Sequence, residues 1–259
     1  MPNSHSPANL HADTIDGVIS SLDKIVDWCL ENSKRTGYFA ALYRAVTINV
    51  KKGIDGGEFD DGVRMERLDV IFANRYLDAF DAYYNRQQVT DCWRLAFQKT
   101  ERWYPLVLQH LMVGMNAHIN LDLGIAAAQT VPADKLPELK PDFDRINGLL
   151  TRMIDGVQKE LSDIWPMMGL LDKLAGRLDE KLAEEGMAFA RNQAWQYALD
   201  YTASTNKEKT IRDMDHRLLL LGEALMGAGL LKLPLFLFIR LGERGSVAKK
   251  ITILAEENK

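Results

Sequence analysis

The spacing of the apolar residues is the feature that most constrains what this chain can fold into. Along nearly the whole sequence these residues recur at intervals of three and four, which places them on one face of an α-helix. Glycine and proline, with 18 and 8 residues in 259, are too sparse for the frequent turns of a β-sandwich or barrel. The pattern predicts an all-α fold.

The sequence predicts a single-domain bundle of about eight helices. Residues 1–12 are expected to form a disordered tail and residues 13–259 the helical domain. Prolines 132, 137 and 141 predict a crossover loop over residues 130–141. The expected helices cover residues 13–33, 38–52, 60–84, 90–100, 105–129, 143–164, 167–201 and 207–226.

The C-terminal segment, residues 230–259, begins with a dense apolar run and is then basic, with Lys249 and Lys250. The run fits either a buried helix or a strand. Residues 218–239 are about as long as a membrane span of roughly 20 residues. Glu223, Lys232 and Pro234 lie inside that stretch, which favours burial in the protein core. The alternative is membrane contact through residues 230–259.

Charge and cysteine content narrow the function classes. With 32 Lys and Arg against 36 Asp and Glu, the chain lacks the basic excess that binds phosphates, which argues against a nucleic-acid partner. Cys29 and Cys92 have no C-x-x-C spacing and are predicted to be free thiols in a reducing compartment. The N-terminus lacks the order of a secretory signal. We therefore expect a cytoplasmic protein with a small-molecule partner.

The segment 105–129 carries the best candidate for chemistry. His110, Gly114, His118 and Asp122 follow one another at steps of four and form one stripe on a helix. His118 and Asp122 would lie about 6 Å apart along the axis, from where an imidazole and a carboxylate can share one ion. They are the predicted ligands of a divalent metal, zinc or iron. His110, about 12 Å from His118, would serve a second ion, a substrate, or neither.

Other polar residues are candidates for contacting a substrate. Asn116 and Asn120 lie on the same otherwise apolar segment and need partners if they are buried. Arg191 and Trp195, four residues apart, form either one wall of a pocket or a surface contact with each other. Gly114 costs a helix about 1 kcal/mol relative to alanine, which indicates close approach by a ligand or by a neighbouring helix.

Carboxylates of segment 60–84 could complete the site. Glu66, Asp69, Asp78 and Asp81 interleave there with apolar and aromatic residues. They either converge on segment 105–129 or form a charge-paired helix surface, and the second interpretation is favoured. The chain has no H-E-x-x-H pair, no pair of Glu-x-x-His motifs, no G-x-S-x-G elbow and no Walker or dinucleotide-binding loop.

The stripe resembles the sequence pattern of a bacterial family of helical proteins known only as a domain of unknown function. The likeness covers about residues 37–201 and includes residues 67–83. It implies a helical fold and no particular reaction. The family pattern His-x3-Gly-x-Asn-Ala-His-Ile-x2-Asp-Leu is matched by His110, Gly114, Asn116, Ala117, His118, Ile119, Asp122 and Leu123.

A weaker resemblance is to the helical zinc-dependent phospholipases C and single-strand nucleases, whose metal helices carry His-x-x-x-Asp. His118 and Asp122 match that motif and, by this resemblance, would hold zinc. Those secreted enzymes use several more histidines and an N-terminal tryptophan. This chain has five histidines, two of which, His5 and His11, lie near the tail.

Together these patterns predict a metal-dependent, hydrolase-like enzyme that acts on a small molecule. The metal would lower the pKa of bound water, with a carboxylate of segment 60–84 as the base. The alternative is a non-catalytic helical ligand-binding or protein-interaction module in which histidine and aspartate form a structural network. The predicted catalytic residues are His110, His118 and Asp122, the metal ligands His118 and Asp122, and the substrate-binding residues Asn116, Asn120, Arg191 and Trp195.

Overall fold

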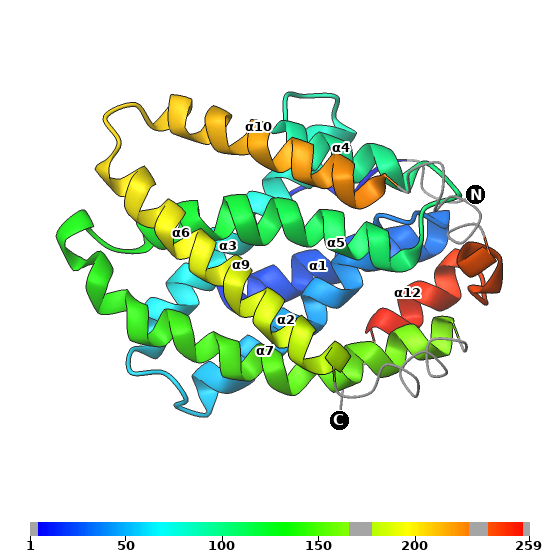
Figure 1. Cartoon of the computed structure of the whole chain (residues 1–259), viewed down its shortest axis with the longest axis horizontal. Helices are drawn as coiled ribbons and strands as arrows, with labels where there is room; N and C mark the ends of the chain where they lie inside the picture. The colour runs from blue at the N-terminus through cyan, green and yellow to red at the C-terminus, as the bar shows by residue number, and fades with distance from the viewer. Residues whose placement is uncertain (1–4, 166–177, 228–237, 256–259) are drawn as a thin grey trace.

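The computed structural model describes residues 5–165, 178–227 and 238–255. All regular secondary structure in these residues is helical, which confirms the all-α prediction (Figure 1). The described part alone has more helices than predicted, because the helix expected over 105–129 is divided and residues beyond 237 contribute further helices. Two stretches lie outside the described residues. They are residues 228–237, which hold most of the apolar run, and residues 166–177, which include the start of the helix expected over 167–201.

The first three helices are α1 (Ile15–Asn32), α2 (Gly37–Asp55) and α3 (Gly62–Tyr84). Capping side chains fix where two of them begin. The hydroxyl of Thr14 accepts the N–H of Gly17, and the carboxylate of Asp61 accepts the N–H of Arg64. These caps explain why the predicted bounds 13–33 and 60–84 lie within two residues of the observed ones.

The residues before α1 are packed rather than free. Leu10 and Ala12 are buried in the main core cluster. The side-chain amide of Asn74 in α3 exchanges two hydrogen bonds with the backbone of Ala12, at 2.9 and 2.7 Å. Within the tail expected over residues 1–12, Leu10 and Ala12 are thus held against the domain, Leu10 by burial and Ala12 by burial and backbone pairing. Residues 1–4 lie outside the described residues.

The predicted helix over 105–129 is observed as three pieces in a row, α5 (Val107–Ala117), a π-helical turn (His118–Asp122) and α6 (Leu123–Thr130). This run passes through the middle of the molecule (Figure 1). α4 (Asp91–Thr100) and α10 (Lys207–Met226) pack against α5. The carboxylate of Asp215 in α10 accepts the N–H groups of Asp91 and Cys92 and so caps α4.

The helix α7 (Leu136–Ile164) begins seven residues earlier than the predicted start at residue 143, after a 3₁₀ turn at Ala133–Lys135. The crossover loop over 130–141 is thus largely helical, and Pro141 lies inside α7. Leu136, Leu139 and Phe143 are buried at helical spacing. Their burial offsets the helix penalty of the proline, about 3 kcal/mol.

Two later helices complete the fold. α9 (Leu178–Ala203) crosses α6 and also packs on α7, while α12 (Val247–Ala255) packs on α2 and α7. Gly124 permits the close crossing of α6 and α9, because a Cβ atom there would lie 2.7 Å from the carbonyl oxygen of Ala194.

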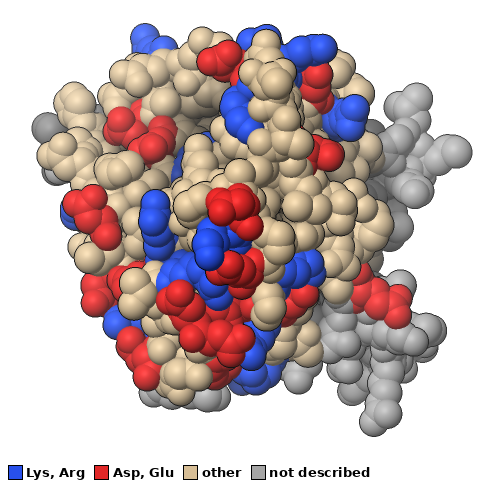
Figure 2. Space-filling model, turned by 90° about the vertical axis from the view of Figure 1, so that its left-hand side faces the viewer, with Lys and Arg blue, Asp and Glu red and all other residues tan. Residues whose placement is uncertain are grey.

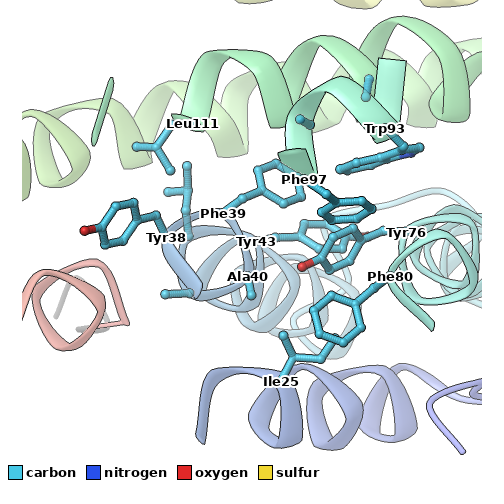
Figure 3. Packing of buried hydrophobic residues seen from close by; sticks show 14 of the residues in the cluster. Ile25, Tyr38, Phe39, Ala40, Tyr43, Tyr76, Phe80, Trp93, Phe97 and Leu111 are labelled. Carbon is cyan, nitrogen blue, oxygen red and sulfur yellow. The ribbon is translucent and has the colours of Figure 1, made fainter. Parts of the chain in front are cut away.

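The main core is rich in aromatic side chains from several helices. Figure 3 shows Phe39 and Tyr43 of α2 facing Tyr76 of α3 and the rings of Trp93 and Phe97 of α4. Phe39 makes edge contacts with Tyr76 and Trp93 at centroid distances of 5.2 and 5.7 Å. Such contacts stabilise a core beyond simple burial. They hold α2, α3 and α4 together beside the π-helical turn.

The surface at the left of Figure 1 carries acidic and basic side chains that are intermixed (Figure 2). None of the described helices combines the length and the apolar content that a bilayer span requires. The two lysines of the C-terminal segment differ. Lys249 is exposed, whereas Lys250 is buried and donates to Glu243 at 3.0 Å.

Candidate ligand-binding site

The π-helical turn at His118–Asp122 is the centre of the site. The N–H of Leu123 donates to the carbonyl of His118, five residues back, so this turn holds one residue more than an α-helical turn. Turns of this kind are rare and occur often at functional sites. The turn brings the side chains of His118 and Asp122 together, with Nδ1 of the histidine 3.4 Å from Oδ2 of the aspartate.

The carboxylate of Asp122 is buried and receives donors from two other helices. Nε of Arg75 in α3 lies 2.8 Å from Oδ1, and Nε1 of Trp93 in α4 lies 2.8 Å from Oδ2. Burial by itself would raise the pKa of this carboxyl, but the charge of Arg75 and the hydrogen bonds from His118 and Trp93 outweigh it and lower the pKa. Asp122 is therefore ionised at neutral pH.

His118 is enclosed by aromatic rings. Phe72 of α3 stacks on the imidazole at a centroid distance of 3.6 Å, and Tyr43 of α2 meets it edge-on at 4.4 Å. Burial lowers the pKa of His118, although Asp122 opposes the shift. The imidazole is thus neutral at pH 7. With Nδ1–H directed to Asp122, Nε2 carries a free lone pair.

An apolar cavity of about 100 Å³ adjoins His118 between α2, α3, α7, α9 and the π-helical turn. A second apolar cavity of about 290 Å³ lies beside it, against α5 and α7. The two share wall residues and therefore adjoin, and we refer to them together as the central cavity. The shared residues are Leu42, Val46, Met115, Leu150 and Met187.

Four polar side chains in the wall of this cavity have buried atoms without a hydrogen-bond partner among the described residues. The atoms are Oη of Tyr43, Oδ2 of Asp69, Nε2 of His118 and Nε of Arg191. Buried polar groups in native proteins are nearly always paired, and each exception calls for an explanation. Four such atoms lie in the wall of the central cavity.

Asp69 is the only carboxylate of α3 that lines the central cavity. Burial, with a smaller contribution from the charge of Glu66, raises its pKa to about 7. The other acidic residues expected to converge on the site lie elsewhere. Glu66 accepts the N–H of Ile15, and Asp78 pairs with exposed His11. The charge-paired surface favoured by the sequence thus holds for Asp78, but not for Asp69.

His110 does not share a cavity with His118. It lines a separate small cavity of about 20 Å³ with Arg35, Phe39 and Thr100, and neither of its ring nitrogens has a hydrogen-bond partner in the part of the chain that the structure describes. Burial, assisted by nearby cationic side chains, lowers its pKa to about 3. The residue that approaches Gly114 is Phe39, because a Cβ atom there would lie 2.5 Å from its ring. A neighbouring helix therefore accounts for that glycine.

The two asparagines bind the protein itself. The amide of Asn116 donates to the carbonyl of Leu218 in α10 at 2.8 Å, and the amide of Asn120 donates to Asn116 at 3.0 Å. Neither lines the central cavity. Asn116 thus joins the central helical run to α10, and Asn120 holds the side chain of Asn116; that both bind substrate stays a prediction.

Arg191 and Trp195 of α9 are both buried, so a surface contact between them is corrected. Arg191 lines the central cavity, lies over the ring of Phe143 at 4.4 Å and donates to the Phe143 carbonyl at 2.5 Å. Trp195 contacts the same ring at 5.0 Å and is not part of the cavity wall. Only Arg191 of this predicted pair reaches the site.

A metal centre fits these donors poorly. Both oxygens of Asp122 already accept hydrogen bonds, and no three His, Cys, Asp or Glu side chains of the described residues lie in a metal-binding arrangement. The sequence did not predict Arg75, Trp93 or Tyr43 as parts of the site. Arg75 lies next to Tyr76 and three residues after Phe72, on the margin of an apolar face, which is a weak signal. No sequence signal marked Trp93 or Tyr43 as residues of the site.

Residues 15–228 match a family described as a family of unknown function, DUF5995. The chain belongs to this family. The comparisons with curated proteins and with solved structures find no match. The DUF5995 match runs from α1 to the end of α10 and includes every residue that lines the central cavity, whereas α12 lies beyond it. The uncharacterised helical family expected from the sequence is thereby confirmed.

Proposed function

We propose that this protein binds an apolar small molecule that carries a polar group, and that the central cavity is its binding site. The supporting observation is the set of four unpartnered polar atoms on Tyr43, Asp69, His118 and Arg191 in one apolar wall. Leaving a buried polar group unpaired costs about 1–3 kcal/mol. A ligand that supplies the missing partners would recover part of this free energy.

The apolar residues of the wall also suit the apolar part of such a ligand. Leucine, valine and methionine side chains line both cavities, and four of the shared ones are only partly buried: Val46, Met115, Leu150 and Met187. Small-molecule sites are typically apolar clefts with a few convergent polar groups. Methionine side chains adapt to irregular ligands because they are unbranched. The proposal therefore accounts for both kinds of wall residue.

Binding of the uncharged fluorescent probe N-phenyl-1-naphthylamine tests this proposal. Leu150→Trp would fill the cavity, because Leu150 lines both of its parts. Leu220→Trp is the matched control, because Leu220 is exposed on α10. We expect saturable fluorescence enhancement with the wild type and the control, and its loss in Leu150→Trp with an unchanged thermal transition.

Two results would overturn the proposal. One is absence of probe binding to the wild-type protein. The other is equal binding by wild type and Leu150→Trp, which would place the probe elsewhere on the protein.

A second candidate function, catalysis on the bound molecule, has its own support. The ionised Asp122 orients neutral His118, and the free Nε2 belongs to a residue of the cavity wall. A base held by a carboxylate in this way can accept a proton from water or a hydroxyl. This hydrolase-like activity uses the predicted residues His118 and Asp122 without requiring a metal.

Hydrolysis of p-nitrophenyl decanoate tests the second candidate. His118→Gln removes the base, and His110→Gln makes the same change in the other cavity. Loss of activity in the first variant alone would support catalysis, and equal activity in both would refute it. The predicted zinc or iron is checked by elemental analysis of protein purified without a metal-affinity tag, where metal that is present in wild type and lost in His118→Gln would support the metalloenzyme hypothesis.

A further inference from the structure

We propose that the ligand of the central cavity is an aliphatic carboxylate whose anionic group pairs with Arg191. This inference rests on the proposed function and names the ligand class. It follows from the charge state and the surroundings of one wall residue, together with the apolar character of the rest of the wall.

Arg191 is a buried cation that has no counter-ion among the described residues. Its residue surface is 3% exposed, and no carboxylate of the described residues lies within ion-pair distance of it. Nη2 donates to the carbonyl of Phe143, while Nε has no partner. Burial lowers the pKa of the guanidinium to about 10, so it remains charged at neutral pH. A buried charge of this kind is unfavourable unless it is paired.

The neighbouring acidic groups do not supply the missing charge. Asp144, which acts on Arg191 from a distance, is bound by Lys140. Asp69 lines the same cavity, but its pKa of about 7 leaves it partly protonated at neutral pH, and it forms no ion pair with Arg191 in the structure. Its protonated form is a donor that a ligand carboxylate can use.

The guanidinium of Arg191 determines which polar group the ligand carries. A guanidinium binds a carboxylate through charge-assisted hydrogen bonds, which are roughly twice as strong as neutral ones. Arg191 is also the only cationic residue in the cavity wall as described. From there the apolar space continues past Leu150 and Met115 toward Met153 and Leu161. An unbranched hydrocarbon chain matches that lining.

Displacement of N-phenyl-1-naphthylamine by decanoate and by decan-1-ol tests the inference, since the two ligands share a chain and differ in charge. Both are used below the concentration at which they form micelles. We expect decanoate to bind wild-type protein about tenfold or more tightly than the alcohol. Arg191→Met should remove this preference, Arg191→Lys should keep part of it, and Arg152→Met, a change of an exposed arginine of α7, should leave it unchanged.

The outcomes separate this inference from the proposed function. If the probe binds and both ligands displace it equally from wild type, the cavity binds apolar molecules but the carboxylate assignment is wrong. That comparison needs no variant, so it decides the matter even if Arg191→Met does not fold. An unchanged preference in folded Arg191→Met would also overturn the inference. Failure of the probe to bind wild type overturns the proposed function itself.

Discussion

Nε of Arg75 donates to Oδ1 of Asp122 at 2.8 Å, across 47 residues of sequence. This ion pair joins α3 to the π-helical turn and places a cation opposite a fully buried carboxylate. Because Trp93 and His118 approach the other oxygen, Asp122 connects α3 and α4 to the central helical run. The carboxylate therefore fixes the position of the imidazole that lines the central cavity.

Replacing Asp122 by asparagine should destabilise the fold. The change removes the charge opposite Arg75, and breaking a buried ion pair typically costs about 3–5 kcal/mol. Since Arg75 keeps some contact with solvent, we expect a loss of about 3 kcal/mol in the free energy of unfolding, measured by urea denaturation. Asp78→Asn on α3 is the control, because Asp78 is mostly exposed. Equal losses in the two variants would contradict the role given to Asp122.

Gly114→Ala tests the contact between α5 and α2. Alanine favours a helix by about 1 kcal/mol over glycine, but its Cβ would lie 2.5 Å from the ring of Phe39. Overpacking typically costs about 1–3 kcal/mol, so we expect a net loss of about 1–2 kcal/mol. Gly148→Ala in α7 meets nothing within 4 Å and should instead gain up to about 1 kcal/mol. Stabilisation by both substitutions would refute this account.

Much of the fold could be predicted from local sequence signals. The bounds of α3 and α4 were predicted to within two residues, because capping residues and apolar periodicity act over short distances. Lys207–Met226 was predicted to the residue for the same reason, with Asn206 as its cap. The π-helical turn was not predicted, since it lies inside an uninterrupted helical pattern and depends on what packs around it.

The candidate site was predictable only in part. His118 and Asp122 were predicted as a pair because they lie four residues apart on one helical segment. Their other contacts join residues far apart in sequence, such as Trp93 with Asp122, and a single sequence does not encode such pairings locally. Pro141 likewise predicted a loop, because the local rule for proline ignores the burial of Leu139 and Phe143.

Lys250→Met and Lys249→Met should differ although the two lysines are adjacent. Lys250 is buried and paired with Glu243, whose Oε1 also accepts the N–H of Val107 at the start of α5. Losing this partner should cost about 2–3 kcal/mol, because Arg240 still pairs with Glu243. Lys249 is exposed, so its substitution should stay within about 0.5 kcal/mol. Thermal unfolding with both variants checks this, and similar midpoints would refute the structural role of Lys250.

His110 should make the protein less stable in acid. Its pKa in the folded state, about 3, lies below the ordinary value of 6.5. Between these values the unfolded chain binds a proton that the folded protein does not, so stability falls as the pH drops through this range. In His110→Leu this contribution is absent, and the slope of unfolding free energy against pH between 6 and 4 should be smaller by about 1.4 kcal/mol per pH unit. Parallel curves would show that His110 is protonated in the folded state.

Asp69 should make the protein less stable as the pH rises, which is the opposite of the effect of His110. Its folded pKa of about 7 lies above the ordinary 3.8, so between these values the folded protein holds a proton that the unfolded chain has released. Stability therefore falls as the pH rises from about 4 to about 7. Asp69→Asn removes this contribution and should gain stability relative to wild type over that range, by up to about 4 kcal/mol. Denaturation curves at several pH values measure the gain, with Asp78→Asn as the exposed control on α3. A constant difference between Asp69→Asn and wild type would mean that the pKa of Asp69 is not raised in the folded protein, and the wall of the central cavity would then carry a negative charge at neutral pH.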